Sequence, residues 1–146
     1  MFNDNISESQ VWDSIDQVGA RRFIEALPNK LNFNVKERGA SLSVGQRQLI
    51  SCIRIMLYDP KIILLDEATS SVDSETESMI QSAISKILKN RTSIVVAHRL
   101  STIKEVDNII VLENGEIKEI GDHNSLNKSG GYYRRLYEMQ NKNILT

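Results

Sequence analysis

The stretch DPKIILLDEATSSVD, residues 59–73, decides the fold of this chain. It contains a run of aliphatic side chains over residues 62–65, and a continuous apolar run is typical of a strand that is buried on both faces. Two acidic residues, Asp66 and Glu67, follow the run directly. The sequence therefore predicts a buried strand with a pair of carboxylates at its carboxyl end.

Carboxylates in this position are suited to binding a metal ion or moving a proton. Open α/β sheets bind ligands at the carboxyl ends of their parallel strands. One carboxylate there can hold a magnesium ion, and a second can orient or deprotonate an attacking water. Short strings of this kind are common, so the local pattern alone favours the plainer interpretation that Asp66 and Glu67 are acids in a solvated turn.

Helical patterns fill the residues before this stretch. The sequence predicts a helix over residues 7–18 that is opened by a capping box, and a second, shorter helix over 21–27. An extended connection over 29–42 leads to a third helix, 43–58, which begins at a capping serine. The Asp59-Pro60 pair ends the third helix, because proline cannot continue it.

Strands and helices alternate after the acidic pair. We expect a helix over residues 74–88 that is opened by a Ser74–Glu77 capping box, then a buried strand over 94–97 and a short helix over 101–106. The next two strands, 109–112 and 116–120, are expected to pair through the Asn114-Gly115 turn. A helix over 132–140 closes the chain. This alternation predicts an α/β layer fold with a mostly parallel sheet.

A second chemical feature stands at the start of the third predicted helix, in the string LSVGQ over residues 42–46. Ser43 supplies a hydroxyl and Gly45 permits close approach of the backbone. Both lie where the free N–H groups and the dipole of a helix N-terminus suit a phosphate. An ordinary serine-capped helix with a glycine in its first turn accounts for the same pattern equally well.

The composition sets limits on the class of protein. The chain has 146 residues, a net charge of −1 and one cysteine. A chain of this length forms one domain or a large piece of one. Its charge gives no bulk attraction to nucleic acid, so no nucleic-acid partner is expected. One cysteine excludes an internal disulfide, and no signal peptide or membrane-spanning run is present in the sequence.

The order of these segments resembles the nucleotide-binding domains of ABC transporters. LSVGQ, residues 42–46, matches the family signature LSGGQ with Val44 in place of one glycine. IILLDE, residues 62–67, matches the Walker B strand, and SSVD, residues 70–73, matches the D-loop. His98 stands where the family has its switch histidine. Four segments in the family's order make this resemblance highly specific.

The resemblance implies a fold like that of the P-loop NTPases, with a mostly parallel sheet and an N-terminal helical signature subdomain. Residues 1–146 would be a partial ABC ATPase domain, with the helical subdomain and signature helix over 1–58 and the C-terminal part of the α/β core over 59–146. No GxxxxGKS or GxxxxGKT string occurs in the sequence, so the phosphate-binding loop and its strand are expected to be missing.

The resemblance also assigns roles to the chain's own acidic residues and histidine. By that likeness, ATP and Mg²⁺ are the expected ligands. Asp66 would coordinate Mg²⁺, and Glu67 would be the general base for attack of water on the γ-phosphate. His98 would contact the γ-phosphate and link it to Glu67. Asp73 would belong to the segment that communicates across the dimer.

The signature residues would act on a different nucleotide. Domains of this family work as head-to-tail pairs, so the resemblance implies that Ser43, Gly45 and Gln46 face the ATP held by a second nucleotide-binding domain. The other expected partner is a transmembrane domain. The segment VKERG, residues 35–39, resembles the one that exporters use to contact their membrane helices.

The resemblance therefore implies part of the ATP-hydrolysing domain of an exporter, at the cytoplasmic face of the membrane. The fragment alone is expected to be inactive. Two alternatives remain open from the sequence. One is a truncated, non-catalytic subunit that completes a partner's ATP site. The other is an ABC ATPase without a transport role, for which long coiled-coil insertions or a basic linker would speak, and the sequence has neither.

Overall fold

The computed structural model describes residues 6–66, 72–97, 100–104 and 106–144. The chain divides into two compact units, Met1–Val95 and Val96–Thr146. The first unit contains the predicted signature helix and the strand that ends in Asp66, and the second contains the predicted hairpin. The predicted division at residues 58 and 59 concerns subdomains of the ABC family and stays a prediction.

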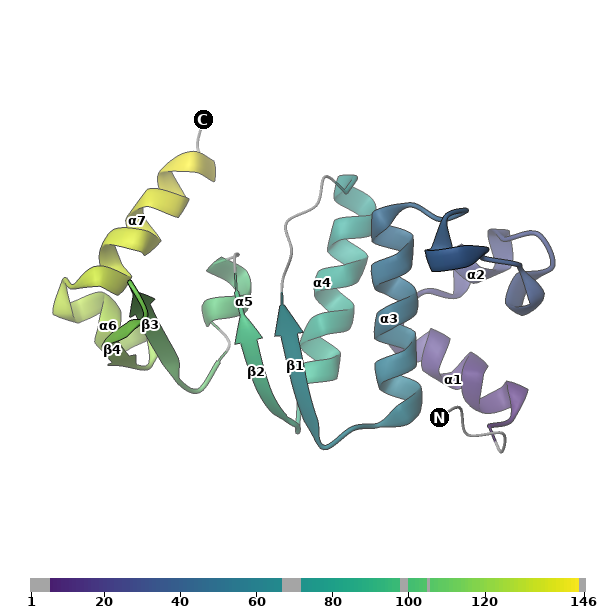
Figure 1. The fold of residues 1–146 in the computed structure, drawn as a ribbon, viewed down its shortest axis with the longest axis horizontal. Helices are drawn as coiled ribbons and strands as arrows, with labels where there is room; N and C mark the ends of the chain where they lie inside the picture. Colours follow the sequence, from purple (N-terminus) through teal and green to yellow (C-terminus); the bar gives the residue numbers. More distant parts are fainter. Residues whose placement is uncertain (1–5, 67–71, 98–99, 105, 145–146) are drawn as a thin grey trace. The chain divides into compact units, whose positions relative to one another are not determined.

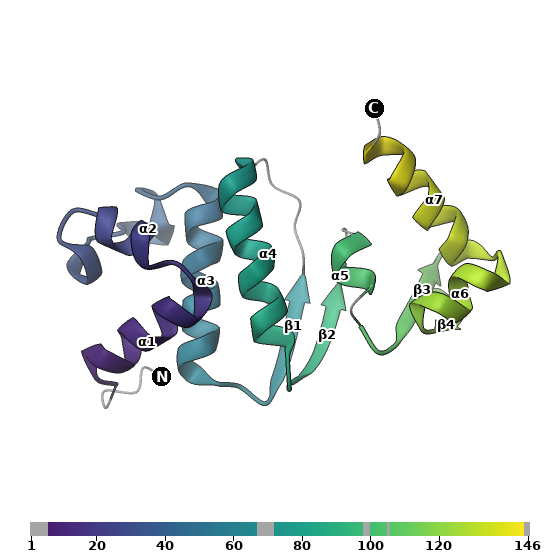
Figure 2. The same ribbon diagram turned by 180° about the vertical axis from the view of Figure 1, so that it is seen from behind.

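The first unit contains helices and the strands of one sheet. In chain order these are α1 (Glu8–Val18), α2 (Arg21–Ala26), η1 (Lys30–Asn32), η2 (Glu37–Gly39), α3 (Val44–Tyr58), β1 (Ile62–Asp66), α4 (Ser74–Leu88) and β2 (Thr92–Val96), whose last residue opens the second unit. In both views α3 lies between α4 on one side and α1 and α2 on the other (Figure 1 and Figure 2).

The predicted helices before the acidic pair are confirmed, with small changes at their ends. The capping box that opens α1 joins Ser7 and Gln10, and Gly19 ends the helix in a left-handed conformation with φ 83°. The connection predicted as extended over residues 29–42 instead contains two short 3₁₀ turns, η1 and η2. Short turns of this kind have no hydrophobic period by which a sequence could reveal them.

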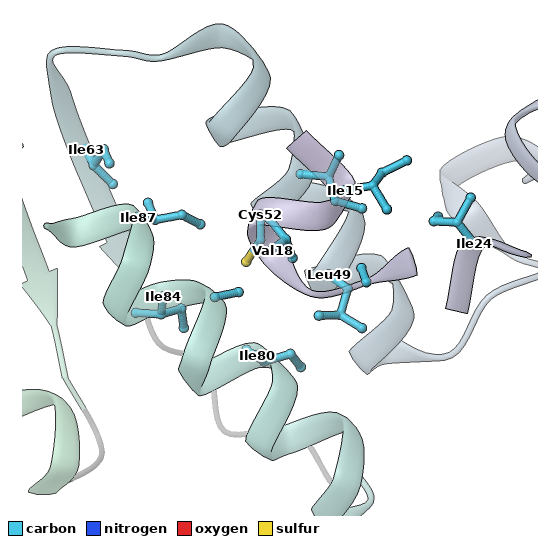
Figure 3. Packing of buried hydrophobic residues seen from close by; sticks show 12 residues of the cluster. Ile15, Val18, Ile24, Leu49, Cys52, Ile63, Ile80, Ile84 and Ile87 are labelled. Carbon is cyan, nitrogen blue, oxygen red and sulfur yellow. The ribbon is translucent and has the colours of Figure 1, made fainter. Parts of the chain in front are cut away.

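The core of the first unit lies between α1, α3 and α4. Ile15 of α1 and Leu49 of α3 are the largest side chains that are almost completely buried, and Ile84 and Ile87 of α4 belong to the same cluster. Figure 3 shows these side chains and Cys52 converging from the three helices. Apolar residues at helical spacing on each helix supply the facing stripes.

The strands β1 and β2 form a parallel pair, as the sequence predicts (Figure 1), but several of their side chains are exposed. Ile63 is buried in the cluster with α4, whereas Ile62 and Leu64 are 65% and 76% exposed. Ile94 of β2 is 62% exposed in the same way. The prediction that these strands are buried on both faces is therefore wrong for this chain. Successive side chains of a strand point to opposite faces, and among the described residues only one face has a layer of helix upon it.

Arg91 ties the ends of three elements of the first unit together. Its side chain is 15% exposed. It donates to the Asp59 carboxylate that follows α3, at 2.7 Å, and to the Ile87 carbonyl in the last turn of α4, at 2.7 Å. Since Arg91 directly precedes β2, this contact fixes the strand to both helices. Asp59 adopts a left-handed conformation with φ 44° and ends α3, as predicted for the Asp59-Pro60 pair.

The second unit contains α5 (Leu100–Lys104), β3 (Ile109–Glu113), β4 (Glu116–Gly121), α6 (His123–Ser129) and α7 (Tyr132–Ile144). The predicted hairpin is confirmed: β3 and β4 pair antiparallel with Ile110 opposite Ile120. Asn114 and Gly115 both have positive φ, 53° and 79°, as a two-residue hairpin turn requires.

The helix α6 was not predicted, because it is short and almost wholly polar. Asp122 caps it by accepting hydrogen bonds from the backbone N–H groups of Asn124 and Ser125, at 2.8 and 3.0 Å. Leu126 is its one buried residue and packs with Val111 and Tyr133. A single apolar contact gives no period from which a helix could be inferred.

A glutamate of the hairpin holds the start of α7. Glu119 accepts hydrogen bonds from the backbone N–H groups of Tyr132 and Tyr133, at 3.1 and 2.8 Å. Gly131 leaves room for this carboxylate, since a side chain there would overlap it. His123 forms a 2.6 Å hydrogen bond with the Tyr133 hydroxyl, so this histidine has a structural partner. Over the described part of the chain, no helix has the length and apolarity needed to cross a membrane.

Candidate functional site

The signature segment forms the N-terminus of α3. Ser43 is the N-cap in extended conformation, and its hydroxyl accepts a hydrogen bond from the Gln46 backbone N–H at 3.2 Å. The Gln46 side-chain oxygen in turn accepts from the Ser43 N–H at 3.0 Å. This capping box orients both side chains at the end of the helix, where the helix dipole favours an anion. The Ser43 hydroxyl still carries a proton that it can donate to a ligand oxygen.

The side chain of Arg47, the residue after Gln46, holds the loop that leads into α3. Arg47 donates to the Leu42 carbonyl at 2.7 Å and to the Gly39 carbonyl at 3.5 Å. The guanidinium therefore ties the turn η2 to the signature segment. Nothing in the sequence marks Arg47 as a positioning residue, because a basic side chain on a helix gives no sign of which carbonyl it will bind.

Gly45 is buried, and because it has no side chain, the residues around the start of α4 can pack closely against it. A Cβ atom built on Gly45 would lie 2.6 Å from the Thr76 Cγ2 atom and 2.7 Å from the Val72 Cγ1 atom. The sequence predicts close approach of the backbone at this glycine, but no local pattern identifies Val72 or Thr76 as its neighbours. Whether Gly45 also faces a nucleotide stays a prediction.

Asp66 is the last residue of β1 and is exposed. Its carboxylate therefore lies at the carboxyl end of a parallel strand, as the sequence predicts. Among the described residues no three acidic, histidine or cysteine side chains gather into a metal site. Mg²⁺ is commonly held by one or two carboxylates together with substrate phosphates, so a single exposed carboxylate fits that ion. Glu67 and His98 lie outside the described residues, and their predicted roles stay predictions.

Asp73 caps α4 and is the last residue of the predicted D-loop, residues 70–73. Its Oδ1 atom accepts a hydrogen bond from the Thr76 backbone N–H at 2.9 Å. The predicted capping box with Ser74 as N-cap is wrong, because Ser74 is already the first helical residue and Asp73 has the extended conformation of a cap. The hydrogen bond from the Thr76 backbone N–H lowers the pKa of the Asp73 carboxyl below its usual value of 3.8.

Substitution of Asp73 by asparagine is expected to change how the stability of the chain depends on pH. The folded-state pKa of Asp73 is lowered, so its ionised form stabilises the fold above pH 3.8, and this contribution is lost as the pH falls through the lower folded-state value. Asparagine caps a helix but does not titrate. Urea unfolding should show wild type ahead of Asp73→Asn at neutral pH and the gap closing below pH 3.8. A gap that is constant with pH would contradict this.

Comparisons with known proteins agree with the resemblance to ABC transporters. The ABC transporter family model matches residues 2–70. The chain is 44% identical over 138 residues to the probable multidrug resistance ABC transporter ATP-binding/permease protein YheH of Bacillus subtilis, covering 94% of the chain and 20% of that protein. It is 45% identical over 136 residues to the multidrug resistance ABC transporter ATP-binding and permease protein of Lactococcus lactis, covering 93% of the chain and 23% of that protein.

A solved structure is similar to the chain over most of its length. A bacterial Atm1-family ABC exporter, determined with ATP bound, superposes with a TM-score of 0.80 and 36% sequence identity over 94% of the chain and 24% of the exporter. The chain belongs to the ABC transporter family and corresponds to part of an exporter-type ATP-binding domain. It spans between about a fifth and a quarter of the length of the relatives it matches.

Proposed function

We propose that residues 1–146 supply the Walker B acid, the catalytic base, the switch histidine and the signature segment of an ATPase that powers export across a membrane. One observation carries this proposal. The strand β1, which ends in Asp66, lies in the same compact unit as α3, whose first turn is the signature segment. A carboxylate for Mg²⁺ and a helix N-terminus for a phosphate are thus built on one scaffold, and the matched proteins include two that are named as multidrug resistance ABC transporters and a solved ABC exporter.

The chain's own residues divide the work of hydrolysis. Asp66 presents an exposed carboxylate that would hold Mg²⁺ on the phosphates of ATP. When bound, Mg²⁺ supplies charge neutralisation to the transferred phosphoryl group. Glu67, the next residue, would accept a proton from the attacking water, and His98 would hold the γ-phosphate beside it. Phosphoryl transfer needs little else beyond positioning and charge.

The signature segment and the turn η2 before it indicate two partners. Ser43, Gly45 and Gln46 would face ATP that is held by a second nucleotide-binding domain in a head-to-tail pair. The turn η2 precedes them, and the side chains of Lys36, which stands directly before the turn, and of Glu37 and Arg38 within it are exposed. Exposed charged side chains at this position are available to a transmembrane domain, so the chain would work at the cytoplasmic face of the membrane.

The 146-residue chain by itself is proposed to be inactive. Its sequence contains no GxxxxGKS or GxxxxGKT string, so neither the backbone cradle for the phosphates nor the phosphate-loop lysine is available from these residues. Asp66 and Glu67 alone would leave most of the charge of the triphosphate to bulk solvent.

The test uses a chimaeric exporter, in which residues 1–146 replace the matching stretch of the Lactococcus lactis protein. Reconstituted in lipid vesicles, the chimaera should move a fluorescent multidrug substrate when ATP is supplied, and the isolated chain should neither bind Mg-ATP in calorimetric titration nor hydrolyse it. A chimaera that inserts and folds but never transports would contradict the proposal, as would tight stoichiometric binding of Mg-ATP by the isolated chain.

A further inference from the structure

The N-termini of α3 and α4 meet at a contact that only glycine permits. A Cβ atom on Gly45 would come within 2.6 Å of the Thr76 Cγ2 atom and 2.7 Å of the Val72 Cγ1 atom. Real Cβ atoms do not approach other carbon atoms so closely, so any larger residue must push at least one neighbour away. Gly45 is buried, and Val72 and Thr76 are both partly buried, so the contact lies within packed side chains.

The neighbours of Gly45 resist displacement. Valine and threonine are branched at Cβ and have few rotamers, so their methyl groups cannot swing aside cheaply. Thr76 is also held through its backbone, because its N–H donates to the Asp73 carboxylate at 2.9 Å. The Glu77 N–H donates to the Asp73 carbonyl at 2.9 Å. Movement of Thr76 would therefore move the cap of α4 with it.

The contact joins two segments to which the ABC resemblance gives different tasks. On one side of Gly45 stand Ser43 and Gln46, which hold each other in the capping box of α3. On the other side stand Val72 and Asp73, the end of the predicted D-loop. A stiff contact between them means that the signature segment and the D-loop of one subunit cannot shift independently.

We propose that Gly45 is a positioning residue that sets the spacing between the signature segment and the D-loop of its own subunit, through van der Waals contact with Val72 and Thr76. This inference rests on the proposed ATPase function. A displacement of the signature segment by the partner's nucleotide is passed through this contact to Asp73. The role is mechanical and is separate from any contact that Gly45 makes with ATP.

The test compares variants of the chimaeric exporter. Gly45→Ala should lower kcat for ATP hydrolysis on the order of 10²-fold, as a misplacement of about 1 Å in a catalytic assembly can do, with little change in KM for ATP. Adding Val72→Ala and Thr76→Ser removes the atoms that the new methyl group meets. This triple variant should recover about tenfold or more of the lost rate, as expected for coupled neighbours. Ser51→Ala, an exposed change further along α3, serves as the matched control and should leave kcat unchanged.

The outcomes separate the inference from the proposed function. Loss of activity without rescue by the paired small substitutions would overturn the positioning role and favour direct contact between Gly45 and a phosphate. Wild-type activity in Gly45→Ala would overturn it as well. If Gly45→Ala does not fold, the triple variant is compared with the double variant Val72→Ala/Thr76→Ser. A triple variant that folds and has the kcat of the double variant supports the positioning role of Gly45. A triple variant that does not fold contradicts it. A wild-type chimaera without any ATPase activity would contradict the proposed function instead.

Discussion

Glu67→Gln in the chimaeric exporter is expected to lower the rate of ATP hydrolysis by about 10²- to 10⁴-fold, the usual cost of losing a general base. The amide keeps the size and shape of the side chain but cannot accept a proton from the attacking water. Nucleotide affinity should persist, since Asp66, the proposed Mg²⁺ ligand, and the signature segment are unchanged. Phosphate release measures the rate, and a fluorescent nucleotide measures binding.

The matched control for this substitution is Glu75→Gln. Glu75 is an exposed glutamate in the first turn of α4, and its substitution changes the net charge by the same amount. It should leave hydrolysis close to that of wild type. Hydrolysis by Glu67→Gln within about threefold of wild type would remove Glu67 from the base role. Such a result would favour the alternative in which this chain only completes an ATP site that a partner builds.

A second large effect is expected from a charge placed at the cap of α3. Aspartate and asparagine both cap helices about as well as serine, so Ser43→Asp and Ser43→Asn should both preserve the fold. The aspartate adds a negative charge where the γ-phosphate of the partner's ATP is proposed to lie. At about 4 Å and an effective dielectric constant of about 20 this repulsion is about 4 kcal/mol. We expect Ser43→Asp to lower hydrolysis roughly 10²- to 10³-fold, and Ser43→Asn to lower it far less.

Mixed dimers test whether the signature segment serves the other subunit's ATP. Each dimer contains one Glu67→Gln subunit, so that only the ATP site using the wild-type Glu67 remains active. Ser43→Asp placed in the Glu67→Gln subunit should abolish the remaining hydrolysis, because that signature segment is proposed to face the active site across the dimer. The same substitution placed in the wild-type subunit should have little effect. The reverse pattern would contradict the assignment in trans.

The parts of the fold that the sequence predicts best are those that depend on neighbouring residues. Ser43 and Gln46 stand three positions apart and form the capping box of α3. Asn114 and Gly115 tolerate positive φ and form the turn of the hairpin. In each case the residues that determine the structure also form it, so no distant partner has to be known.

The features that the sequence did not predict depend on packing from elsewhere in the chain or on backbone conformation. The aliphatic run of β1 indicates that both faces suit burial, but it cannot tell which face has a neighbour, and Leu64 is exposed. Ser74 and Asp73 are both good capping residues, and only the backbone conformation distinguishes them. The contact of Gly45 with Val72 and Thr76 joins residues of different elements, and no local pattern marks it.

ATP hydrolysis by the purified chimaeric exporter is the measurement that tests the central claim most directly. If residues 1–146 supply the Walker B acid, the base, the switch histidine and the signature segment, the chimaera should hydrolyse Mg-ATP within about tenfold of the parent exporter, and Glu67→Gln should remove that activity. Hydrolysis no faster than that of the Glu67→Gln chimaera, in a protein that folds and inserts into the membrane like the parent, would contradict the account.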